Sequence, residues 1–464
     1  MKTHKKVLLI NPNTIRPPIA PIGLEYVGEY LKQNGIKVFI CDLSFNENLI
    51  KKIKTFKPDF IGITIRNIDD CSFKSRKFFL PEIKKLVSKI KKITKAPIIA
   101  GGVGFSVSPV EILKFLNIDF GIYGDGENAF LKFILKYPDF SKVPNLIYKK
   151  NGKYIKNKNE FFNLCFLKPK RILFNNKKYF KEGGMLGIET KRGCPKRCIF
   201  CVDYISKGEK LRLRPAKNVT SEIKELLKQG INYFHLCDSE FNIPYSHAVS
   251  ICNQIIKEKL NNKIFWYCYC SPFNFDYKLA KLMKKAGCKG INFGVDSGND
   301  KILKILGKDY TVRDIIKTAD ACHKAGLTFM FDLLLGAPGE NKNTIIQTIN
   351  LMKKLKPDVV GTAMGVRIYK NTPIENILKK ENKNAFYPQI IGNSDLLRPV
   401  FYISSRIGKK IFDFVESLVK NDKRFLFSYG KDKRDYNYNE NKVLENAIAK
   451  GARGAYWDIL RNIR

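Results

Sequence analysis

The chain has 464 residues, of which 44% are hydrophobic and 12% aromatic, and this length allows two or three domains with substantial cores. The composition excludes an intrinsically disordered protein, and no run of about 18 uncharged apolar residues suggests a membrane-spanning helix. The N-terminal MKTHKKVLLINP has too short an apolar core for a signal peptide and is typical of a strand, so we expect a cytoplasmic protein.

The net charge of +41, from 84 Lys and Arg against 43 Asp and Glu, has two interpretations. One is a nucleic-acid or anionic-membrane partner. The other is a compositional bias that spreads lysines over solvated helix surfaces. Lys84, Lys85, Lys89, Lys91 and Lys92 are distributed along one predicted helix rather than gathered in an arm or tail, which favours the second interpretation.

Residues 5–135 alternate between short apolar runs and helical patterns, such as 23–35 and a long basic pattern over 81–94. Five runs are typical of buried strands: 6–12, 37–43, 58–65, 96–102 and 120–127. Strands that alternate with helices predict a doubly wound parallel sheet, which we assign to a first domain of residues 1–140.

Four loops rich in Gly, Pro and small polar residues follow predicted strands of this domain. They are NPNTIRPPIAPIG (11–23), RNIDD (66–70), GGVGFSVSP (101–109) and GDGEN (124–128). Ligands of such sheets bind beyond the carboxyl ends of the strands. Small residues there allow the backbone to approach a phosphate-bearing ligand closely, so we expect these loops to share one site.

A second series of strands and helices follows a basic, irregular segment, which we expect to be a linker or hairpin over residues 141–185. Six further strands are predicted: 187–192, 233–238, 265–271, 290–296, 329–336 and 359–366. Repeating βα units over residues 186–394 indicate a partial parallel barrel, whose active face is the carboxyl end of its strands. Residues 395–464 are expected to form a smaller cap.

Twelve cysteines are present, and nine of them lie singly or as C-x-C in apolar runs, where cysteine serves as a small hydrophobe. The other three, Cys194, Cys198 and Cys201, form the cluster GCPKRCIFC. This C-x3-C-x2-C spacing can hold three irons of a four-iron, four-sulfur cubane and leaves one iron open. Zinc would need a fourth ligand, and the nearest histidine, His235, lies far along the chain, so we favour an iron–sulfur cluster over zinc.

The segment CPKRCIFC resembles the signature of the radical S-adenosylmethionine (SAM) enzymes. This resemblance implies a [4Fe-4S] cluster whose open iron binds SAM, and an external one-electron reductant. In that family, reductive cleavage of SAM gives a 5′-deoxyadenosyl radical. Further segments resemble the family's SAM-contacting motifs, although Asp296 replaces the usual glutamate. The residues implied are Phe200 within the triad, Asp238, Ser239 and Glu240 after the second strand, Asp296 and Ser297 after the fourth, and Gly336 after the fifth.

The first domain resembles the cobalamin-binding domain that precedes the barrel in cobalamin-dependent members of this family. Its implied cobalamin contacts are Pro21, Gly23, Arg66, Asn67, Gly101, Gly102, Val103, Gly104, Gly124, Gly126 and Glu127. No histidine occurs between His4 and His235, so the lower axial histidine of many cobalamin proteins is absent. Arg66 would either lie near the lower face of cobalt and discourage a ligand there, or bind a phosphate or an acidic neighbour.

The resemblance implies a methyltransferase that passes a methyl group from SAM through cobalamin to a poorly nucleophilic carbon. Three alternatives stay open: a cobalamin-dependent radical enzyme that cyclises, couples carbons or oxidises without methylation; a tRNA methylthiotransferase; and a zinc-dependent nucleic-acid-binding module. The methylthiotransferases carry a second cysteine triad, which Cys41, Cys71 and Cys165 do not match. The substrate stays open among small molecules, peptides and lipids, and nucleic acid is not favoured.

The C-terminal segment 449–462 combines glycines with Tyr456 and Trp457. It suggests either a lid that contacts substrate or a helix that packs its aromatic side chains on the barrel, and we favour the second.

Overall fold

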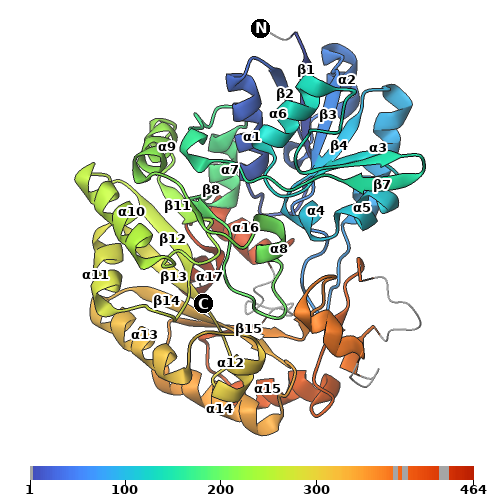
Figure 1. Ribbon diagram of the computed structural model, residues 1–464. Helices are drawn as coiled ribbons and strands as arrows, with labels where there is room; N and C mark the ends of the chain where they lie inside the picture. Colours follow the sequence, from blue (N-terminus) through green and yellow to red (C-terminus); the bar gives the residue numbers. More distant parts are fainter. Residues whose placement is uncertain (1–3, 380–384, 389–395, 428–437, 464) are drawn as a thin grey trace.

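The computed structural model describes residues 4–379, 385–388, 396–427 and 438–463. Figure 1 shows two α/β parts side by side, an N-terminal part in blue and cyan and a crescent in green to orange. The last helices, in red, lie inside the crescent. None of the described helices is both long and apolar enough to cross a bilayer.

The first sheet has seven strands in the order β2-β1-β3-β4-β5-β6-β7, and the first five of these are mutually parallel. The strands are β1 Lys6–Asn11, β2 Lys37–Asp42, β3 Phe60–Thr64, β4 Ile98–Gly101, β5 Phe120–Ile122, β6 Leu146–Lys150 and β7 Lys153–Lys156. Along β1, Leu9 belongs to one core cluster and Leu8 to another, so both faces of the strand are buried. Burial on both faces explains the continuous apolar runs, and the predicted doubly wound sheet is confirmed.

Helices cover both faces of this sheet. Those on one face are α1 Ile22–Gln33 and α6 Glu127–Lys136, whose apolar side chains pack with Val7 and Leu9. Those on the other face are α2 Leu49–Phe56, α3 Leu80–Ile93 and α5 Pro109–Leu116, which pack with Leu8 and Ile10. The short elements η1 Leu43–Phe45 and α4 Val103–Val107 follow the carboxyl ends of β2 and β4.

Residues 141–185 contain the hairpin that was one of the two expectations, and they do more than link the domains. Their hairpin, β6 and β7, extends the first sheet, because β6 pairs antiparallel with β5 and places Tyr148 opposite Phe120. After η2 Leu164–Phe166, the side chain of Arg171 is fully buried and donates to Glu25 of α1 at 2.6 Å and to Glu222 of the barrel at 2.7 Å. The segment ends with α7 Asn176–Gly183 and thus joins the two parts through buried charge.

The second sheet is parallel throughout and has the order β19-β15-β14-β13-β12-β11-β8. Its strands are β8 Leu186–Ile188, β11 Tyr233–Leu236, β12 Phe265–Cys270, β13 Cys288–Asp296, β14 Thr328–Leu335, β15 Val359–Met364 and β19 Phe425–Phe427. Within the described residues its two edge strands, β8 and β19, do not pair, so the barrel is open, as predicted. The run expected as one strand over 187–192 is divided into β8 and β9 Lys191–Arg192, which pairs with β10 Arg212–Leu213.

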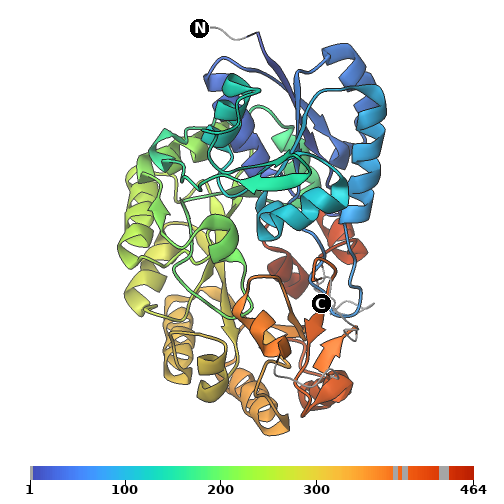
Figure 2. The ribbon, with the colours of Figure 1, turned by 45° about the vertical axis from the view of Figure 1, so that its right-hand side comes forward.

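Helices cover the outer face of the crescent (Figure 2). They are α9 Ala216–Lys228, α10 Tyr245–Lys257, α11 Tyr277–Lys285, α12 Asp300–Ile305, α13 Val312–Ala325 and α14 Lys342–Leu355. Local sequence sets their ends: Asp276 caps α11 by accepting from Leu279 N at 2.8 Å, and α13 starts with a capping box between Thr311 and Asp314. Gly326 ends α13 in the left-handed conformation.

The C-terminal region is more than the expected cap, because it supplies the seventh barrel strand, β19. It also includes η5 Gly408–Lys410, α15 Ile411–Val419 and β18 Phe401–Tyr402. β18 forms a small sheet with β16 Val366–Arg367 and β17 Phe386–Tyr387, which come from the range expected for the barrel, as does η3 Pro373–Lys379. The final helices, α16 Lys442–Ala449 and α17 Tyr456–Asn462, pack inside the crescent against Tyr267 and Met330. This confirms that the aromatic helix docks on the barrel.

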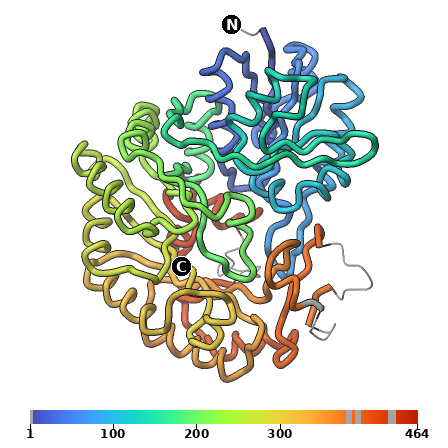
Figure 3. The backbone as a smooth tube through the Cα atoms, viewed as in Figure 1, coloured from blue at the N-terminus to red at the C-terminus, as the bar shows by residue number. Residues whose placement is uncertain are grey.

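The loop after β3 extends from the first domain to the C-terminal region, and Figure 3 shows its blue trace approaching the orange segments. There Asp69 forms an ion pair with Arg367 at 2.8 Å, and Cys71 Sγ lies 3.0 Å from the hydroxyl of Tyr369. The two parts are therefore joined on both sides of the space between them.

Candidate functional site

The carboxyl ends of both sheets border one cavity of about 630 Å³. The loops of the first domain form one side, and the ends of β8 and β11, the start of α8 Asp203–Lys207, and α17 form the other. Twelve predicted site residues line it: Pro21, Gly23, Arg66, Asn67, Gly101, Gly102, Val103, Gly124, Gly126, Glu127, Asp238 and Ser239. The three cysteines, Phe200, Glu240, Asp296, Ser297, Gly336 and Gly104 are not among the residues that line it.

Two glycines hold the loops after β3 and β4 against each other. Gly102 has a φ of 103°, and a Cβ there would lie 2.7 Å from Ile65 O. A Cβ on Gly104 would lie 2.8 Å from Arg66 O, an oxygen that accepts from Gly104 N at 3.0 Å. Gly104 therefore lies behind the cavity and presents the Arg66–Asn67 backbone to it.

The cavity extends as an apolar slot between the sheet and helices α1 and α6. Its walls here are Leu24, Val27, Ile99, Ile122 and Phe130. A side chain on Gly62 would obstruct the packing at this wall, since its Cβ would lie 2.8 Å from Leu9 Cδ2 and 2.9 Å from Phe130 Cε1. A Cβ on Gly23 would meet nothing within 4 Å. A slot with glycines at its mouth fits a bulky ligand with an extended tail, as cobalamin has.

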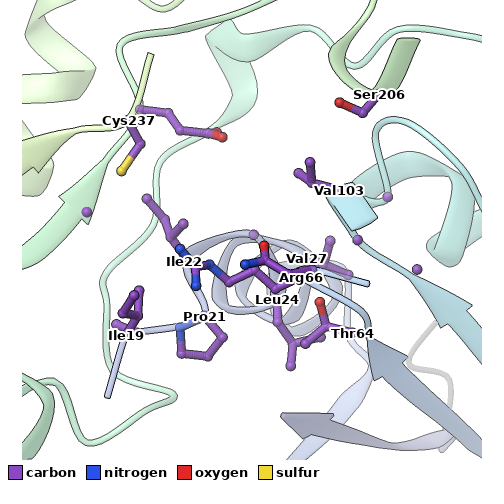
Figure 4. A pocket seen from close by; sticks show the side chains of 18 of the residues that line it. Ile19, Pro21, Ile22, Leu24, Val27, Thr64, Arg66, Val103, Ser206 and Cys237 are labelled. Atoms are coloured by element: carbon purple, nitrogen blue, oxygen red, sulfur yellow. The ribbon is translucent and has the colours of Figure 1, made fainter. Parts of the chain in front are cut away.

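Arg66 is the cation of this cavity that lacks a partner. Within the described parts of the chain its guanidinium makes no hydrogen bond or ion pair, and Figure 4 shows it among the labelled side chains that border the open space. Its exposed surface faces the cavity, and burial from bulk solvent lowers its pKa, an effect that Cys237, Tyr456 and Tyr269 nearby oppose. No acidic neighbour in the described residues binds it, so it is available to a ligand.

The three cysteines lie on the loop between β9 and β10. Gly193 has a φ of 94°, and a Cβ there would clash with Lys210 O at 2.1 Å, so only glycine allows the chain to enter this loop. Cys194 N donates to Gly208 O at 2.9 Å, and Cys201 N to Cys198 O at 3.1 Å. Burial raises the pKa of Cys194 to about 11 and that of Cys201 to about 12, and it also raises the pKa of Cys198.

No three His, Cys, Asp or Glu side chains in the described residues are arranged to hold a single metal ion. This holds for Cys194, Cys198 and Cys201 as well. A cubane needs a different arrangement, because each cysteine binds a separate iron. The donor set of three thiols on one glycine-bounded loop therefore fits a [4Fe-4S] cluster with one iron left for another ligand.

Charged side chains surround the triad. Glu240 has a buried carboxylate oxygen, Oε2, that lacks a hydrogen-bond partner, and burial raises its pKa against the opposing effect of Lys308 and Lys196. An unpartnered carboxylate oxygen here fits the ammonium group of SAM, which the sequence resemblance assigned to this segment. Asp296 instead forms a buried ion pair with Lys308.

Lys308 and Tyr310 are site residues that sequence reasoning missed. Lys308 Nζ lies 5.2 Å from the centre of the Phe200 ring, and Tyr310 donates to Gly294 O at 2.6 Å. The preceding Leu306 O accepts from Ile199 N at 3.1 Å, so this segment supports the cysteine loop. The available signal was weak: a Gly-Lys-Asp-Tyr turn, which in the structure follows the short helix α12.

Four other predicted contacts have protein partners in this structure. Asp238 accepts from Lys191 Nζ at 3.0 Å and from Thr190 N at 2.9 Å. Ser239 donates to Asp203 at 2.5 Å. Ser297 is fully buried, and its Oγ accepts from Asn299 N at 3.3 Å. Gly336 N donates to Glu340 at 2.5 Å. Their assignment to SAM remains a prediction, and of the four only Asp238 and Ser239 also line the cavity.

Comparisons with known proteins agree with this geometry. The sequence model of the radical SAM superfamily, a protein family, matches residues 188–352, and the family model of the B12 binding domain matches residues 10–134. A tryptophan 2-C-methyltransferase of Streptomyces laurentii is 27% identical over 436 residues, covering 78% of this chain and 72% of that protein. An uncharacterised methyltransferase of Pyrococcus horikoshii is 27% identical over 81% of this chain and 85% of its own length.

Solved structures extend the likeness to the whole chain. The radical SAM methyltransferase TsrM from Kitasatospora setae, with tryptophan and a SAM analogue bound, superposes with a TM-score of 0.90 at 25% identity and covers 99% of this chain and 98% of that one. The cobalamin-dependent SAM radical enzyme OxsB gives 0.73 at 20% identity, covering 89% of this chain and 66% of its own, which shows a shared fold.

Proposed function

Because the chain is a B12-binding radical SAM protein with cobalamin, a [4Fe-4S] cluster and SAM as cofactors, we propose that it transfers a methyl group from SAM, through cobalamin, to a poorly nucleophilic carbon. The cluster supplies electrons and cobalamin carries the methyl group. In this proposal Cys194, Cys198 and Cys201 hold the cluster, and Glu240 receives the SAM ammonium group. The glycine loops and Arg66 hold cobalamin.

One observation carries the proposal: the predicted cobalamin loops and the barrel mouth border a single cavity. Val103 of the first domain and Ser206, just beyond the cysteine triad, both line it and are seen close together in Figure 4. Two cofactors and one substrate can therefore meet at one cavity between the two domains.

The barrel side of the cavity suggests a small aromatic substrate. Tyr269 is 44% exposed although it lies inside the crescent, and its ring is 4.9 Å from that of His235. Burial lowers the pKa of His235 to about 4, so this imidazole is neutral at pH 7. Tyr438, Tyr456 and Trp457 complete an aromatic wall. Aromatic walls favour flat apolar ligands, and TsrM, the relative of similar fold, binds tryptophan.

The experiment is an anaerobic incubation of the reconstituted enzyme with methyl-labelled SAM, a one-electron reductant and tryptophan. We expect labelled methyl in a product of tryptophan or, in a panel of related aromatic compounds, of one of its members. Formation of 5′-deoxyadenosine and an altered substrate without label would contradict methyl transfer and support a radical enzyme that does not methylate. Relatives of that kind exist, such as an anaerobic magnesium-protoporphyrin IX monomethyl ester cyclase of Rubrivivax gelatinosus, 24% identical over 77% of this chain.

A tRNA methylthiotransferase is less well supported, although such proteins are also among the relatives. The other cysteines of the N-terminal half, Cys41, Cys71 and Cys165, lie on three separate segments of the chain rather than on one loop. Cys41 is buried in β2, whereas Cys165 is exposed in η2. An assay for labelled or thiolated tRNA would separate this activity from the proposed one.

A further inference from the structure

The cysteine triad is carried by a ribbon that contacts the first domain through charged side chains. This cysteine ribbon consists of β9, β10 and the loop of residues 193–211 between them, and it pairs Arg192 with Arg212 in antiparallel register. Arg192 stands two positions before Cys194. Any movement of the ribbon relative to the first domain would therefore move the three thiols relative to the cobalamin loops.

The partners of the two arginines are Asp125 and Glu127, in the predicted cobalamin loop between β5 and α6. Arg192 Nη2 donates to Glu127 Oε1 at 2.7 Å, and its Nη1 donates to Glu127 Oε2 at 3.1 Å and to Asp125 Oδ1 at 3.2 Å. Arg212 forms an ion pair with the other oxygen of Asp125. Both carboxylate oxygens of each acid are thus engaged by the ribbon.

These ion pairs are shielded from water. The exposed fractions of the side chains are 9% for Arg192, 6% for Asp125 and 1% for Glu127. Burial alone would disfavour the charge on Arg192, but Glu127, Glu189 and Asp125 keep its pKa well above its usual value. A buried two-point pair of this kind fixes distance and orientation, whereas an exposed ion pair would not.

A second contact supports the same arrangement. The helix α8, which begins two residues after Cys201, packs against α4 of the first domain. Arg212 Nη2 donates to Lys207 O, at the end of α8, at 2.5 Å. Arg212 therefore holds the helix and Asp125 at the same time.

We propose that Arg192 and Arg212, bound to Asp125 and Glu127, form a clamp that sets the position of the iron–sulfur cluster relative to cobalamin. Arg192 is then a positioning residue that acts through Glu127, and the predicted cobalamin contact of Glu127 becomes secondary to this pairing. The inference rests on both cofactors being bound and not on methyl transfer. Small errors in placement between reacting groups cost large factors in rate.

The test uses holoenzyme reconstituted with both cofactors. Arg192→Gln and Glu127→Gln remove the charge on either side of the clamp, and Arg192→Lys keeps a cation without the two-point geometry. The matched control is Glu222→Gln, which weakens another buried link between the two parts, where Arg171 and Arg214 bind Glu222 at 2.7 and 2.5 Å. Iron and cobalamin contents, melting temperature and the pulsed-EPR distance distribution between the reduced cluster and cob(II)alamin are measured.

We expect Arg192→Gln and Glu127→Gln to retain both cofactors within about twofold, to shift or broaden the distance distribution, and to lower turnover at least about tenfold. Arg192→Lys should show a smaller change in the same direction. Glu222→Gln should lower the melting temperature and leave the distance distribution as in the wild type.

Three results would overturn the clamp: an unchanged distribution in both charge-removing variants, loss of one cofactor in place of its displacement, or the same broadening in Glu222→Gln. The EPR measurement needs no substrate, so failure of methyl transfer and failure of the clamp are separate outcomes.

Discussion

Trp457 packs its ring against Gly290, so that a Cβ on this glycine would lie 2.8 Å from Trp457 Cη2 and 3.0 Å from Cζ2. Gly290 lies on β13, in the middle of the barrel sheet, and Trp457 is on the last helix of the chain. The inner face of the barrel is therefore shaped to accept the C-terminal helix, whose aromatic residues also line the cavity.

Gly290→Ala should destabilise the protein by about 1–3 kcal/mol, because the added methyl group overpacks a buried contact with a rigid ring. The measurement is urea or thermal unfolding. Gly294→Ala is the control on the same strand, since its Cβ would meet nothing within 4 Å, and its stability should match the wild type or exceed it by about 0.4–1 kcal/mol.

In a Trp457→Leu background the cost of Gly290→Ala should be smaller, because the nearer obstructing ring is absent and only Tyr267 Cδ1, 3.1 Å from the added Cβ, remains close. An equal cost in both backgrounds would show that the glycine is required for another reason.

The stability of the protein should depend on pH through Glu340. This side chain is fully buried, and burial raises its pKa to about 7 from an ordinary value of 4.5, although Gly336 N and Ala337 N donate to it. Between these two pH values the folded state holds a proton that the unfolded state has released. The free energy of unfolding should therefore fall by up to about 3 kcal/mol as the pH rises from about 4.5 to 7.

Glu340→Gln should remove this part of the pH dependence, which urea unfolding at pH 5 and pH 7.5 measures. The exposed Glu82→Gln serves as the control and should leave the slope unchanged. An identical slope in Glu340→Gln and the wild type would contradict the assignment.

Arg66→Gln should leave the fold intact, within about 1 kcal/mol, because the described structure shows no protein partner for the guanidinium to lose. We expect the variant to bind cobalamin with an altered absorption spectrum and to lose at least about tenfold in methyl transfer, since the cation that faces the ligand is gone. The methyl-transfer rate of Arg66→Lys should lie between that of Arg66→Gln and that of the wild type. A wild-type spectrum together with wild-type turnover would exclude a role for Arg66 at cobalamin.

Replacement of Cys194, Cys198 or Cys201 by Ala should each remove most of the bound iron and abolish turnover, because each thiolate holds one iron of the cluster. Iron analysis after anaerobic reconstitution checks this. Cys165→Ala, an exposed cysteine outside the loop, should bind as much iron as the wild type. Cobalamin content should be unaffected in all four variants, as the cobalamin loops belong to the other domain.

Local pattern was sufficient for much of the fold. The buried strands of the first domain and the helices of the barrel have strong periodicity and clear capping residues, such as Asp276 and Thr311, so both α/β parts were predicted correctly. The cysteine triad was also recognisable, because its three ligands lie within eight residues of one another. These features depend on neighbours in the chain, which a sequence displays directly.

Short elements that depend on distant partners were not recognised. The three-residue strand β19 has no periodicity of its own and exists because it pairs with β15, some 60 residues earlier in the chain. The β6–β7 hairpin lies in the segment expected to be a linker or hairpin, but its pairing with β5 in the first sheet was not predicted, for the same reason. Likewise, no local sequence pattern shows that the carboxylate of Asp238 is hydrogen-bonded by Lys191, or that Lys308 lies over the ring of Phe200.

The sequence by itself determined the order of the two domains, the donor set for the cluster and the glycine loops, since each follows from residue type and spacing over short distances. Only the tertiary structure decided how the two sites face each other. Arg192 and Glu127 are 65 residues apart and carry charges that would suit many surfaces, and only the folded chain buries them as a pair between the cysteine ribbon and the cobalamin loop. Long-range pairing of this kind forms only when both domains have folded and packed against each other, and no local sequence pattern encodes that packing.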